Sequence, residues 1–439
     1  MLFHNQLHYP YTIGVSMTLI DRASRPFSES SKGRDPLVNE SATSGPQWRV
    51  VAIGTALAVA LVFGAVRAAG AQMGVLGIVG LLLGVVLYRA RFGFTSAWRQ
   101  LVAVGQGRAI RAQMVMLAAG SILFALVLSQ HWGLFGVTPK PYVFPLGMSL
   151  VVGSFLFGLG MQLAGSCASG TLYVAGSGQG VTIATLFGFV AGSVLGSWNF
   201  PFWTKQTPAG PAVSLAQSRL GYGGALLVQL AAFALIAGIT ILIQRRRTPP
   251  PIEEGLKASG WLRLVRGTWP LIAGAIGLAI LNAVTLAISG QPWGITFAFA
   301  LWGAKALQGI GYNIGNWPYW HAGPNASALH HSLFANVTST MDLAIILGAL
   351  IAAGVAGSFT RWRLPKPKVA VGAVLGGALM GYGARIAFGC NIGSYFSGIV
   401  SFSLHGWVWA VMALIGTWVG IKFRPLFGLS NPKPTDSVC

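Results

Sequence analysis

The sequence predicts an all-α, polytopic membrane protein built from two repeat-related halves. Hydrophobic residues make up 54% of the 439 positions and charged residues only 8%, a composition that soluble domains of this length do not normally have. Apolar runs long enough to cross a membrane recur along the chain, and their polarity does not alternate as it does in the strands of a membrane β-barrel. One cysteine-containing segment also occurs twice, which predicts the division into halves.

The repeated segment is a cysteine framed by glycines. Residues 158–170 contain Cys167, and residues 381–393 contain Cys390, 223 positions later. At this offset Gly158, Gly160 and Ala164 also have identical counterparts. Two cysteines at equivalent places in two apolar stretches indicate an internal repeat in which one cysteine from each half faces a shared site. Three cysteines do not form a disulfide framework, and the last residue, Cys439, is expected to be inert.

Composition divides the chain into five parts. The polar N-terminal stretch is expected to be disordered, and it lacks the charged start and apolar core of a signal peptide. An Arg- and Pro-rich stretch after residue 244 marks the boundary between the halves. The predicted parts are an N-terminal tail (1–48), a first membrane repeat (49–244), a basic linker (245–267), a second membrane repeat (268–425) and a C-terminal tail (426–439).

The first half contains six predicted spans. They cover about residues 50–67, 73–88, 112–128, 146–164, 181–198 and 225–243. The basic loop 89–111 is expected in the cytoplasm because Lys and Arg concentrate on that side. Residues 165–179 are too short and too rich in glycine for a span. They are expected to form a re-entrant turn, which membrane proteins tolerate where it is buried in protein or lines a cavity.

The second half is less regular. Its predicted apolar runs cover about residues 270–288, 293–309, 343–356, 371–388 and 407–421, with an irregular stretch at 311–340. Its basic loop, 361–368, follows a different span from the basic loop of the first half. If both loops are cytoplasmic, the halves are inverted repeats, which place a site at the membrane midplane. Inversion requires one apolar run of the second half not to cross fully, and a parallel arrangement would instead put residues 361–368 outside.

The charge distribution favours an anion pathway. The net charge is +21, yet no carboxylate lies between residues 50 and 252, and Asp342 alone lies inside the second half. Proton and cation pathways usually need buried carboxylates, whereas pores with Arg and Lys at their mouths suit anions. Most of the basic excess is expected at cytoplasmic loops. No soluble basic domain is present to bind nucleic acid.

The two cysteine motifs are the predicted substrate-binding site. Their residues are Gly165, Ser166, Cys167 and Ser169 in the first half and Gly389, Cys390 and Asn391 in the second. Small residues let the backbone amides approach and cradle an anion. A thiol adds a weak donor and a polarisable sulfur, which suits a sulfur-bearing anion better than phosphate. The alternative is two small buried cysteines at tight helix crossings.

Three basic residues near the motifs have two interpretations each. Arg91 and Lys305 are placed at repeat-related helix ends, where they attract anions or extend to the lipid headgroups. Arg385 lies five residues before Cys390 and either takes part in the function or has a structural role at a helix end.

No metal or cofactor is predicted. His321, His330 and His331 lack cysteine or carboxylate partners for a zinc site. Asp342 is interpreted as a helix N-terminal carboxylate that stabilises the helix dipole.

Four segments resemble the YeeE/YedE family of bacterial inner-membrane proteins. They are residues 160–170, 384–391, 91–99 and 403–407. The resemblance implies a multi-pass inner-membrane protein that takes up sulfur-containing ions, thiosulfate above all, through an hourglass bundle of full-length and half-length helices. It also implies that Cys167 and Cys390 lie in the waist, where thiols pass thiosulfate along by S–H hydrogen bonds. The family's thiosulfate transporters carry a further cysteine in a segment similar to 91–95, where this chain has Gly93.

The leading hypothesis is therefore a transporter, not an enzyme, whose partners are the bilayer and a small sulfur-containing anion. The thiols are expected to be protonated, since a thiolate would repel an anion. By resemblance, a TusA-like or rhodanese-like sulfur carrier is a cytoplasmic partner, and a selenium oxyanion is an alternative substrate. The rival hypothesis is a membrane sulfurtransferase or thiol redox protein that forms a persulfide on Cys167. It needs a base, and His405 is the only nearby candidate.

Overall fold

The computed structural model describes residues 45–249 and 265–433. Within these two ranges the regular elements are helices, and pairing between extended segments is limited to two isolated bridges. Ten helical segments of the described chain are long and apolar enough to cross a membrane. The prediction of an all-α, multi-pass membrane protein is therefore confirmed. Most of the predicted N-terminal tail, most of the linker and the end of the C-terminal tail lie outside the described residues.

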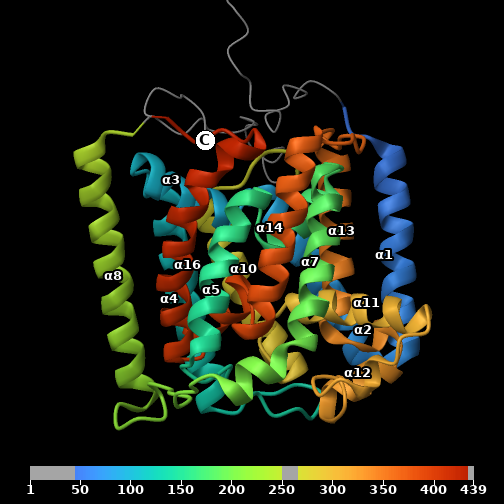
Figure 1. Cartoon of the computed structure of the whole chain (residues 1–439), viewed down its shortest axis with the longest axis horizontal. Helices are drawn as coiled ribbons and strands as arrows, with labels where there is room; N and C mark the ends of the chain where they lie inside the picture. Colours follow the sequence, from blue (N-terminus) through green and yellow to red (C-terminus); the bar gives the residue numbers. More distant parts are fainter. Residues whose placement is uncertain (1–44, 250–264, 434–439) are drawn as a thin grey trace, which may run out of the picture. The chain divides into compact units, whose positions relative to one another are not determined.

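The first half places its long helices close to the six predicted spans (Figure 1). They are α1 (Trp48–Ala69), α2 (Ala71–Ala90), α4 (Arg108–Ser129), α5 (Met148–Ala164), α7 (Val181–Trp198) and α8 (Gly221–Arg247). Two short helices follow α2 and α5, namely α3 (Phe94–Val104) and α6 (Ala168–Gly176). A π-helical turn, η1 (Phe202–Gln206), lies between α7 and α8. Residues 165–179, which are too short and too rich in glycine for a span, thus form a break in the helix followed by the short helix α6.

The second half combines four long helices with several shorter pieces. Its long helices are α10 (Leu271–Ser289), α13 (Val337–Ala356), α14 (Pro367–Ile386) and α16 (Leu404–Phe423). The 14-residue α11 (Thr296–Gly309) follows α10, and the π-helical η4 (Asn391–Ser397) and α15 (Gly398–Val400) follow α14. The remaining pieces are η2 (Ile314–Asn316), α12 (Gly323–His330), η3 (Leu333–Ala335) and η5 (Arg424–Phe427). The predicted run at 293–309 therefore yields a helix that is absent from the candidate spans.

α13 begins earlier than predicted, and this overturns the interpretation of Asp342. The helix starts at Val337, and the side chain of Asn336 caps it by accepting a hydrogen bond from the Ser339 amide at 3.0 Å. Asp342 is the sixth residue of the helix, beyond the first turn where backbone amides need a capping acceptor. Asp342 is therefore not an N-terminal capping residue.

Glycines set the directions of the packed helices. A Cβ on Gly158 would collide with the backbone of Ala413, so α5 and α16 touch backbone to backbone. Successive contacts show that α16 runs parallel to α5, that α14 runs antiparallel to α5, and that α7 runs parallel to α14. On the other side of the molecule α2 and α13 run parallel to each other. α10 starts beside the end of α2, where the Trp269 amide donates to the Arg89 carbonyl at 2.8 Å, so it runs the opposite way.

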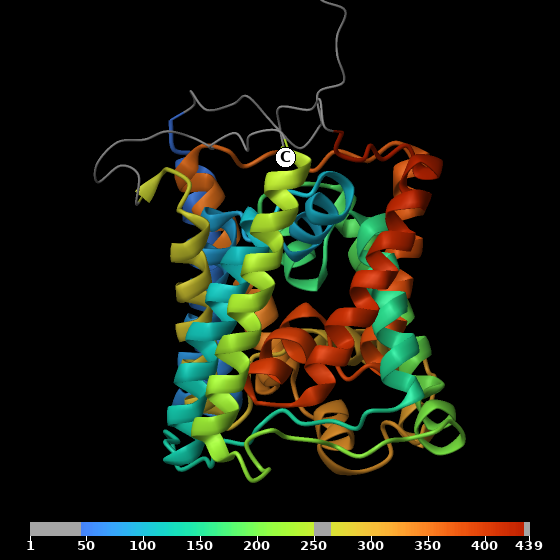
Figure 2. The same ribbon diagram turned by 90° about the vertical axis from the view of Figure 1, so that its left-hand side faces the viewer.

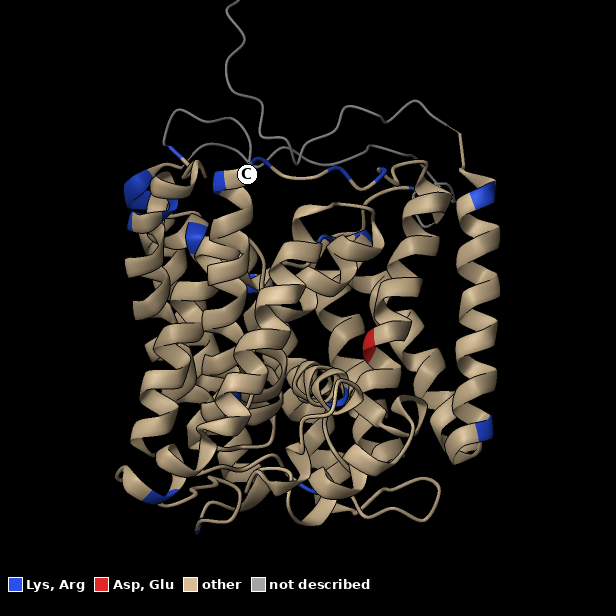
Figure 3. Cartoon of the chain, turned by 45° about the vertical axis from the view of Figure 1, so that its right-hand side comes forward, with Lys and Arg blue, Asp and Glu red and all other residues tan. Residues whose placement is uncertain are grey.

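Both predicted basic loops lie at one end of the bundle. α2 and α13 run parallel and lead into the loops 89–111 and 361–368 respectively. The end of α8 joins them, since a Cβ on Gly105 would contact the side chain of Arg247. Lys and Arg gather at this end in Figure 3. In Figure 2 the short helical pieces lie between walls of long helices, those of the first half toward this basic end and those near residues 390–400 toward the other.

Candidate functional site

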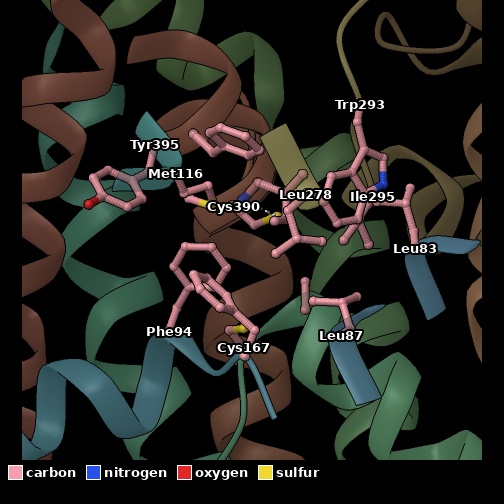
Figure 4. Close-up of a cluster of buried hydrophobic side chains, with 14 of the residues drawn as sticks. Leu83, Leu87, Phe94, Met116, Cys167, Leu278, Trp293, Ile295, Cys390 and Tyr395 are labelled. Carbon is pink, nitrogen blue, oxygen red and sulfur yellow. Dashed lines mark hydrogen bonds between the residues drawn. The ribbon is translucent and has the colours of Figure 1, made fainter. Parts of the chain in front are cut away.

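Four short helices begin around one apolar centre. The residues that precede their first turns are Gly93 for α3, Cys167 for α6, Ile295 for α11 and Cys390 for η4. Phe94, Cys167, Ile295 and Cys390 belong to one buried hydrophobic cluster (Figure 4). The first-turn amides of a helix are unpaired and carry partial positive charge. The geometry therefore directs several helix N-termini, and two thiols, toward the middle of the protein.

Cys167 sits in the break between α5 and α6. α5 ends at Ala164, and Gly165 takes the left-handed conformation (φ 79°) that turns the chain out of the helix. Cys167 is extended and 1% exposed, with its sulfur 3.5 Å from the Ser169 hydroxyl. The Ser166 hydroxyl is instead paired with Thr171 Oγ1 at 2.9 Å. Of the two predicted serines, Ser169 is thus the one beside the thiol.

Cys390 occupies the corresponding break after α14. Gly389 has φ 151° and Cys390 is extended, 1% exposed, and accepts a hydrogen bond on Sγ from the Ile392 amide at 3.4 Å. The carbonyl of Phe388 accepts a hydrogen bond from the Tyr142 hydroxyl at 2.5 Å. Asn391 is fully buried, and within the described structure neither its Oδ1 nor its Nδ2 has a hydrogen-bond partner. A buried amide without partners is rare and points to a ligand or water beside Cys390.

The two cysteines face each other across the apolar centre. Figure 4 shows Cys167 and Cys390 between the rings of Phe94 and Tyr395 and the side chains of Met116 and Leu278. Both cysteines belong to the same buried hydrophobic cluster. Among the described residues, neither sulfur has a hydrogen bond to a carboxylate, histidine, lysine or arginine. The S–H groups are therefore polarisable contacts in an apolar surrounding.

The predicted basic residues are not all brought to the cysteines. Arg91 is exposed at the end of α2 in a left-handed conformation (φ 47°). Lys305 lies inside α11 rather than at a helix end, and its ammonium donates to the Leu329 carbonyl at 2.9 Å. Arg385 is buried and donates to the Thr296 carbonyl at 2.9 Å and to the Tyr319 hydroxyl. Arg385 thereby joins α14 to the start of α11.

The histidines do not form a catalytic or metal centre in the described ranges. His321, His330 and His331 are exposed, and no group of three His, Cys, Asp or Glu side chains suited to a metal occurs there. His405 is buried, with Nδ1 2.7 Å from the Ser403 hydroxyl and its ring packed on Tyr142 and Phe144. His405 makes no hydrogen bond to either cysteine.

Sequence reasoning missed the contribution of α3 and α11. The signal that could have found it is a second repeat: Phe92-Gly93-Phe94-Thr95 matches Trp293-Gly294-Ile295-Thr296 at both its glycine and its threonine. Phe94, the first residue of α3, and Ile295, the residue before α11, both lie at the apolar centre. This match pairs Arg91 with Pro292, not with Lys305.

Comparison with known proteins places the chain in a family. The family model for sulphur transport matches residues 89–419, which include both cysteine motifs. The chain belongs to the sulphur transport family. The thiosulfate transporter TsuA of Spirochaeta thermophila is 31% identical over 361 residues, which cover 78% of this chain and 96% of the relative. The thiosulfate transporter TsuA of Escherichia coli is 27% identical over 356 residues (78% and 91%), and the probable transporter YedE of Escherichia coli is 33% identical over 162 residues (36% and 39%).

Membership of the sulphur transport family confirms the resemblance to YeeE/YedE proteins. The family and these relatives are transporters, in agreement with the expectation that the chain is not an enzyme. The match runs from the last two residues of α2 into α16 and leaves α1 and nearly all of α2 outside.

Proposed function

We propose that this member of the sulphur transport family takes up thiosulfate, or a closely related sulfur-containing anion, through a narrow central pathway past Cys390 and Cys167. The observation that carries the proposal is the meeting of two buried thiols, each placed at the start of a short helix, in one apolar cluster. The two relatives named thiosulfate transporters, which align with most of this chain, support this substrate.

The proposal includes an inverted-repeat architecture of the hourglass type. Four helices of the first half have a counterpart in the second that runs the opposite way: α2 and α10, α4 and α13, α5 and α14, α7 and α16. In the first half α3 follows α2 and α6 follows α5, and in the second half α11 follows α10 and η4 follows α14. We interpret these short pieces as half-length, re-entrant helices. Inverted repeats of this kind place the substrate site at the bilayer midplane, between broken helices whose N-termini point at the anion.

The direction of transport follows from the orientation of the charges. We place the basic end, with the loops 89–111 and 361–368, in the cytoplasm of a bacterial inner membrane. α14 runs away from this end and α5 runs toward it, so Cys390 lies on the outer side of the constriction and Cys167 on the inner side. An imported anion therefore meets Cys390 and Asn391 first and Cys167 and Ser169 second. The parts predicted from composition, with repeats at 49–244 and 268–425, fit this arrangement.

The chemistry of the site suits a soft anion. Both thiols are proposed to be neutral, because an apolar surrounding without a cationic partner disfavours a thiolate. Each S–H is a weak donor and a polarisable contact for the terminal sulfur of thiosulfate, while helix N-termini and the Asn391 amide serve its oxygens. Weak donors also release the anion readily, which conduction through a narrow pathway requires.

The test is uptake of radiolabelled thiosulfate into proteoliposomes, with unlabelled thiosulfate, sulfate, selenite and sulfide as competitors. Cys167→Ala and Cys390→Ala should each lower uptake at least about tenfold if the removed S–H contact is worth roughly 1.4 kcal/mol in the transported state. Cys439→Ser is the matched control, since this cysteine lies outside both repeats. Uptake at the wild-type rate in both alanine variants would exclude a thiol-lined pathway. Uptake of labelled selenite without uptake of labelled thiosulfate would identify a selenium oxyanion as the substrate.

The rival sulfurtransferase hypothesis gains no support from the site. A persulfide on Cys167 requires a thiolate and hence a neighbouring base or cation, and the nearest contacts of its sulfur include only the Ser169 hydroxyl. Mass spectrometry of Cys167 after turnover tests this hypothesis directly. A soluble TusA-like or rhodanese-like carrier is proposed from the family resemblance alone, and the basic end is the surface at which it would receive the anion.

A further inference from the structure

Asp342 is an acidic residue in an unusual place. It is the only Asp or Glu in the ranges 45–249 and 265–433, and its side chain is 0% exposed. Both carboxyl oxygens lack a hydrogen-bond partner among the described residues. The acidic colour in Figure 3 appears at a single place in the interior of the bundle, away from the basic residues at its two ends. Neither helix capping, which Asn336 performs, nor an ion pair accounts for this carboxyl.

The carboxyl lies on the face of α13 that meets the short helices. Residues three and four apart share one face of a helix. Ser339, three positions before Asp342, accepts a hydrogen bond from the Trp302 indole of α11 at 3.1 Å. Ile346, four positions after it, contacts α6 at Gly176. Asp342 is thus between α11 and α6, two of the helices that begin at the apolar centre to which Cys390 belongs.

No cation in the packed elements neutralises Asp342. The elements packed against α13 are α1, α2, α6, α11 and η3. Their titratable or charged side chains are Arg49 and Arg67 at the ends of α1, Tyr88 and Arg89 in α2, Tyr173 in α6 and Lys305 in α11, while η3 has none. Tyr88 pairs with Ser358, Arg89 with the Val265 carbonyl and Lys305 with the Leu329 carbonyl. An ionised carboxylate at Asp342 would therefore be buried without compensation.

We propose that Asp342 is the proton-binding site of this transporter and that one proton moves inward with each anion. This rests on the proposed function. An anion beside Cys390 repels an ionised carboxylate nearby, so anion binding and protonation of Asp342 favour each other, and the coupling is reciprocal. The carboxylate takes its proton from the outer side when the anion enters and gives it to the cytoplasm when the anion leaves. The proton cancels one of the two negative charges of thiosulfate, which lowers the work of import against an interior-negative potential.

The experiment uses the full-length protein in proteoliposomes with the membrane potential clamped at zero and radiolabelled thiosulfate as the probe. Coupling to one proton predicts that the accumulation ratio rises about tenfold for each pH unit of acid-outside gradient. Asp342→Asn has nearly the shape of the protonated acid and no titratable group. It should lose all dependence on the gradient while still exchanging labelled for unlabelled thiosulfate, which also shows that it is folded. Asp342→Glu retains a carboxyl and should keep the dependence.

Three outcomes would overturn the proposal. If the Asp342→Asn variant still accumulates thiosulfate in response to the pH gradient, this carboxyl is not the proton site. A wild-type protein that exchanges thiosulfate but ignores the gradient would exclude proton coupling. Loss of exchange in both Asp342→Asn and Asp342→Glu would show a structural role instead. A wild-type protein without thiosulfate exchange would contradict the proposed function itself, and the exchange assay thus separates the two failures.

Discussion

At the scale of single residues, the site depends on side chains that are costly for stability. Asn391 is buried with an unpaired amide, and Asp342 is buried with an unpaired carboxyl. Each such group destabilises the folded protein by roughly 1–3 kcal/mol or more relative to an apolar side chain of similar shape. Two such groups beside the same apolar centre have a plain explanation if each binds something that the folded chain alone does not contain.

Asn391→Leu separates the stability of the fold from the function of the site. Leu has the same number and branching of side-chain heavy atoms as Asn and removes the unpaired amide, so the melting temperature should stay the same or rise, because roughly 1–3 kcal/mol of desolvation cost is removed. Thiosulfate uptake should fall at the same time, because the proposed donor beside Cys390 is lost. Thermal unfolding in detergent and uptake in proteoliposomes measure the two effects. A variant that is less stable and transports normally would assign Asn391 to the fold instead.

Gly93→Cys tests the thiol that the chain lacks relative to the family resemblance. Gly93 has an extended backbone (φ −115°), which any residue adopts, and a Cβ there would meet the Ser96 hydroxyl at 2.7 Å. Because Ser96 can change rotamer, the variant should fold with a loss of about 1 kcal/mol or less. Uptake of thiosulfate should rise if a third thiol extends the relay.

Gly93→Ala is the matched control for this gain, since it adds the Cβ without the sulfur. Equal uptake by the cysteine and alanine variants would show that position 93 does not contribute a thiol contact.

At the scale of helices, the long elements could be predicted from sequence and the short ones could not. A membrane span of about 20 apolar residues is a strong signal, and the predicted run at 181–198 coincides with α7. α3 and α6 are shorter than a span, and glycines interrupt the approach to them, so hydropathy alone does not reveal that they are helices. α11 lies within the apolar run predicted at 293–309, but it is too short for a span. The error at α13 has a specific cause. The cap is Asn336, seven residues before the start of the apolar run predicted at 343–356, so the helix end predicted at Asp342 is wrong.

The candidate site was predictable only where the repeat was visible. Both cysteine motifs were found because they match residue by residue, and the structure brings them into one cluster. Phe94 and Ile295 belong to a second repeated segment in which only Gly and Thr are identical, which gives a weak signal. Nothing in the sequence shows that the Lys305 ammonium donates a hydrogen bond to the Leu329 carbonyl, because that contact depends on how α12 packs against α11.

The contact between α5 and α16 yields a prediction about helix packing. A Cβ at Gly158 would overlap the backbone of Ala413, which no rotamer change can relieve. Gly158→Ala should therefore push the helices apart and destabilise the protein by about 1–3 kcal/mol. In contrast, Gly238→Ala in α8 meets nothing within 4 Å and should leave stability unchanged or raise it by about 1 kcal/mol, because Ala has the higher helix propensity. Chemical or thermal unfolding of both variants checks the contrast, and equal stability would contradict the backbone contact.

At the scale of the whole molecule, the parallel pairing of α2 with α13 supports the proposed inverted arrangement over the parallel arrangement of the halves. In an inverted arrangement the loops that follow these helices share one side of the membrane, whereas a parallel arrangement of the halves would separate them. The charge asymmetry favours the proposed cytoplasmic placement of that shared end, because the triple arginine at the end of α8 lies there as well. α7 runs parallel to α14, which starts at the basic end, so α7 ends at the opposite end of the bundle. Residues on the α7–α8 connection therefore lie at that opposite end.

Cysteine labelling in intact cells tests this topology. In a Cys439→Ser background, Cys167 and Cys390 are buried and should react slowly with a membrane-impermeant maleimide. Arg108→Cys and Arg363→Cys place exposed thiols at the basic end, and Lys205→Cys places one at the opposite end. Only Lys205→Cys should be labelled from outside, and all three should be labelled after permeabilisation. Labelling of either Arg108→Cys or Arg363→Cys from outside would separate the two basic loops and exclude the inverted repeat, and with it the shared midplane site on which a pathway past Cys390 and Cys167 depends.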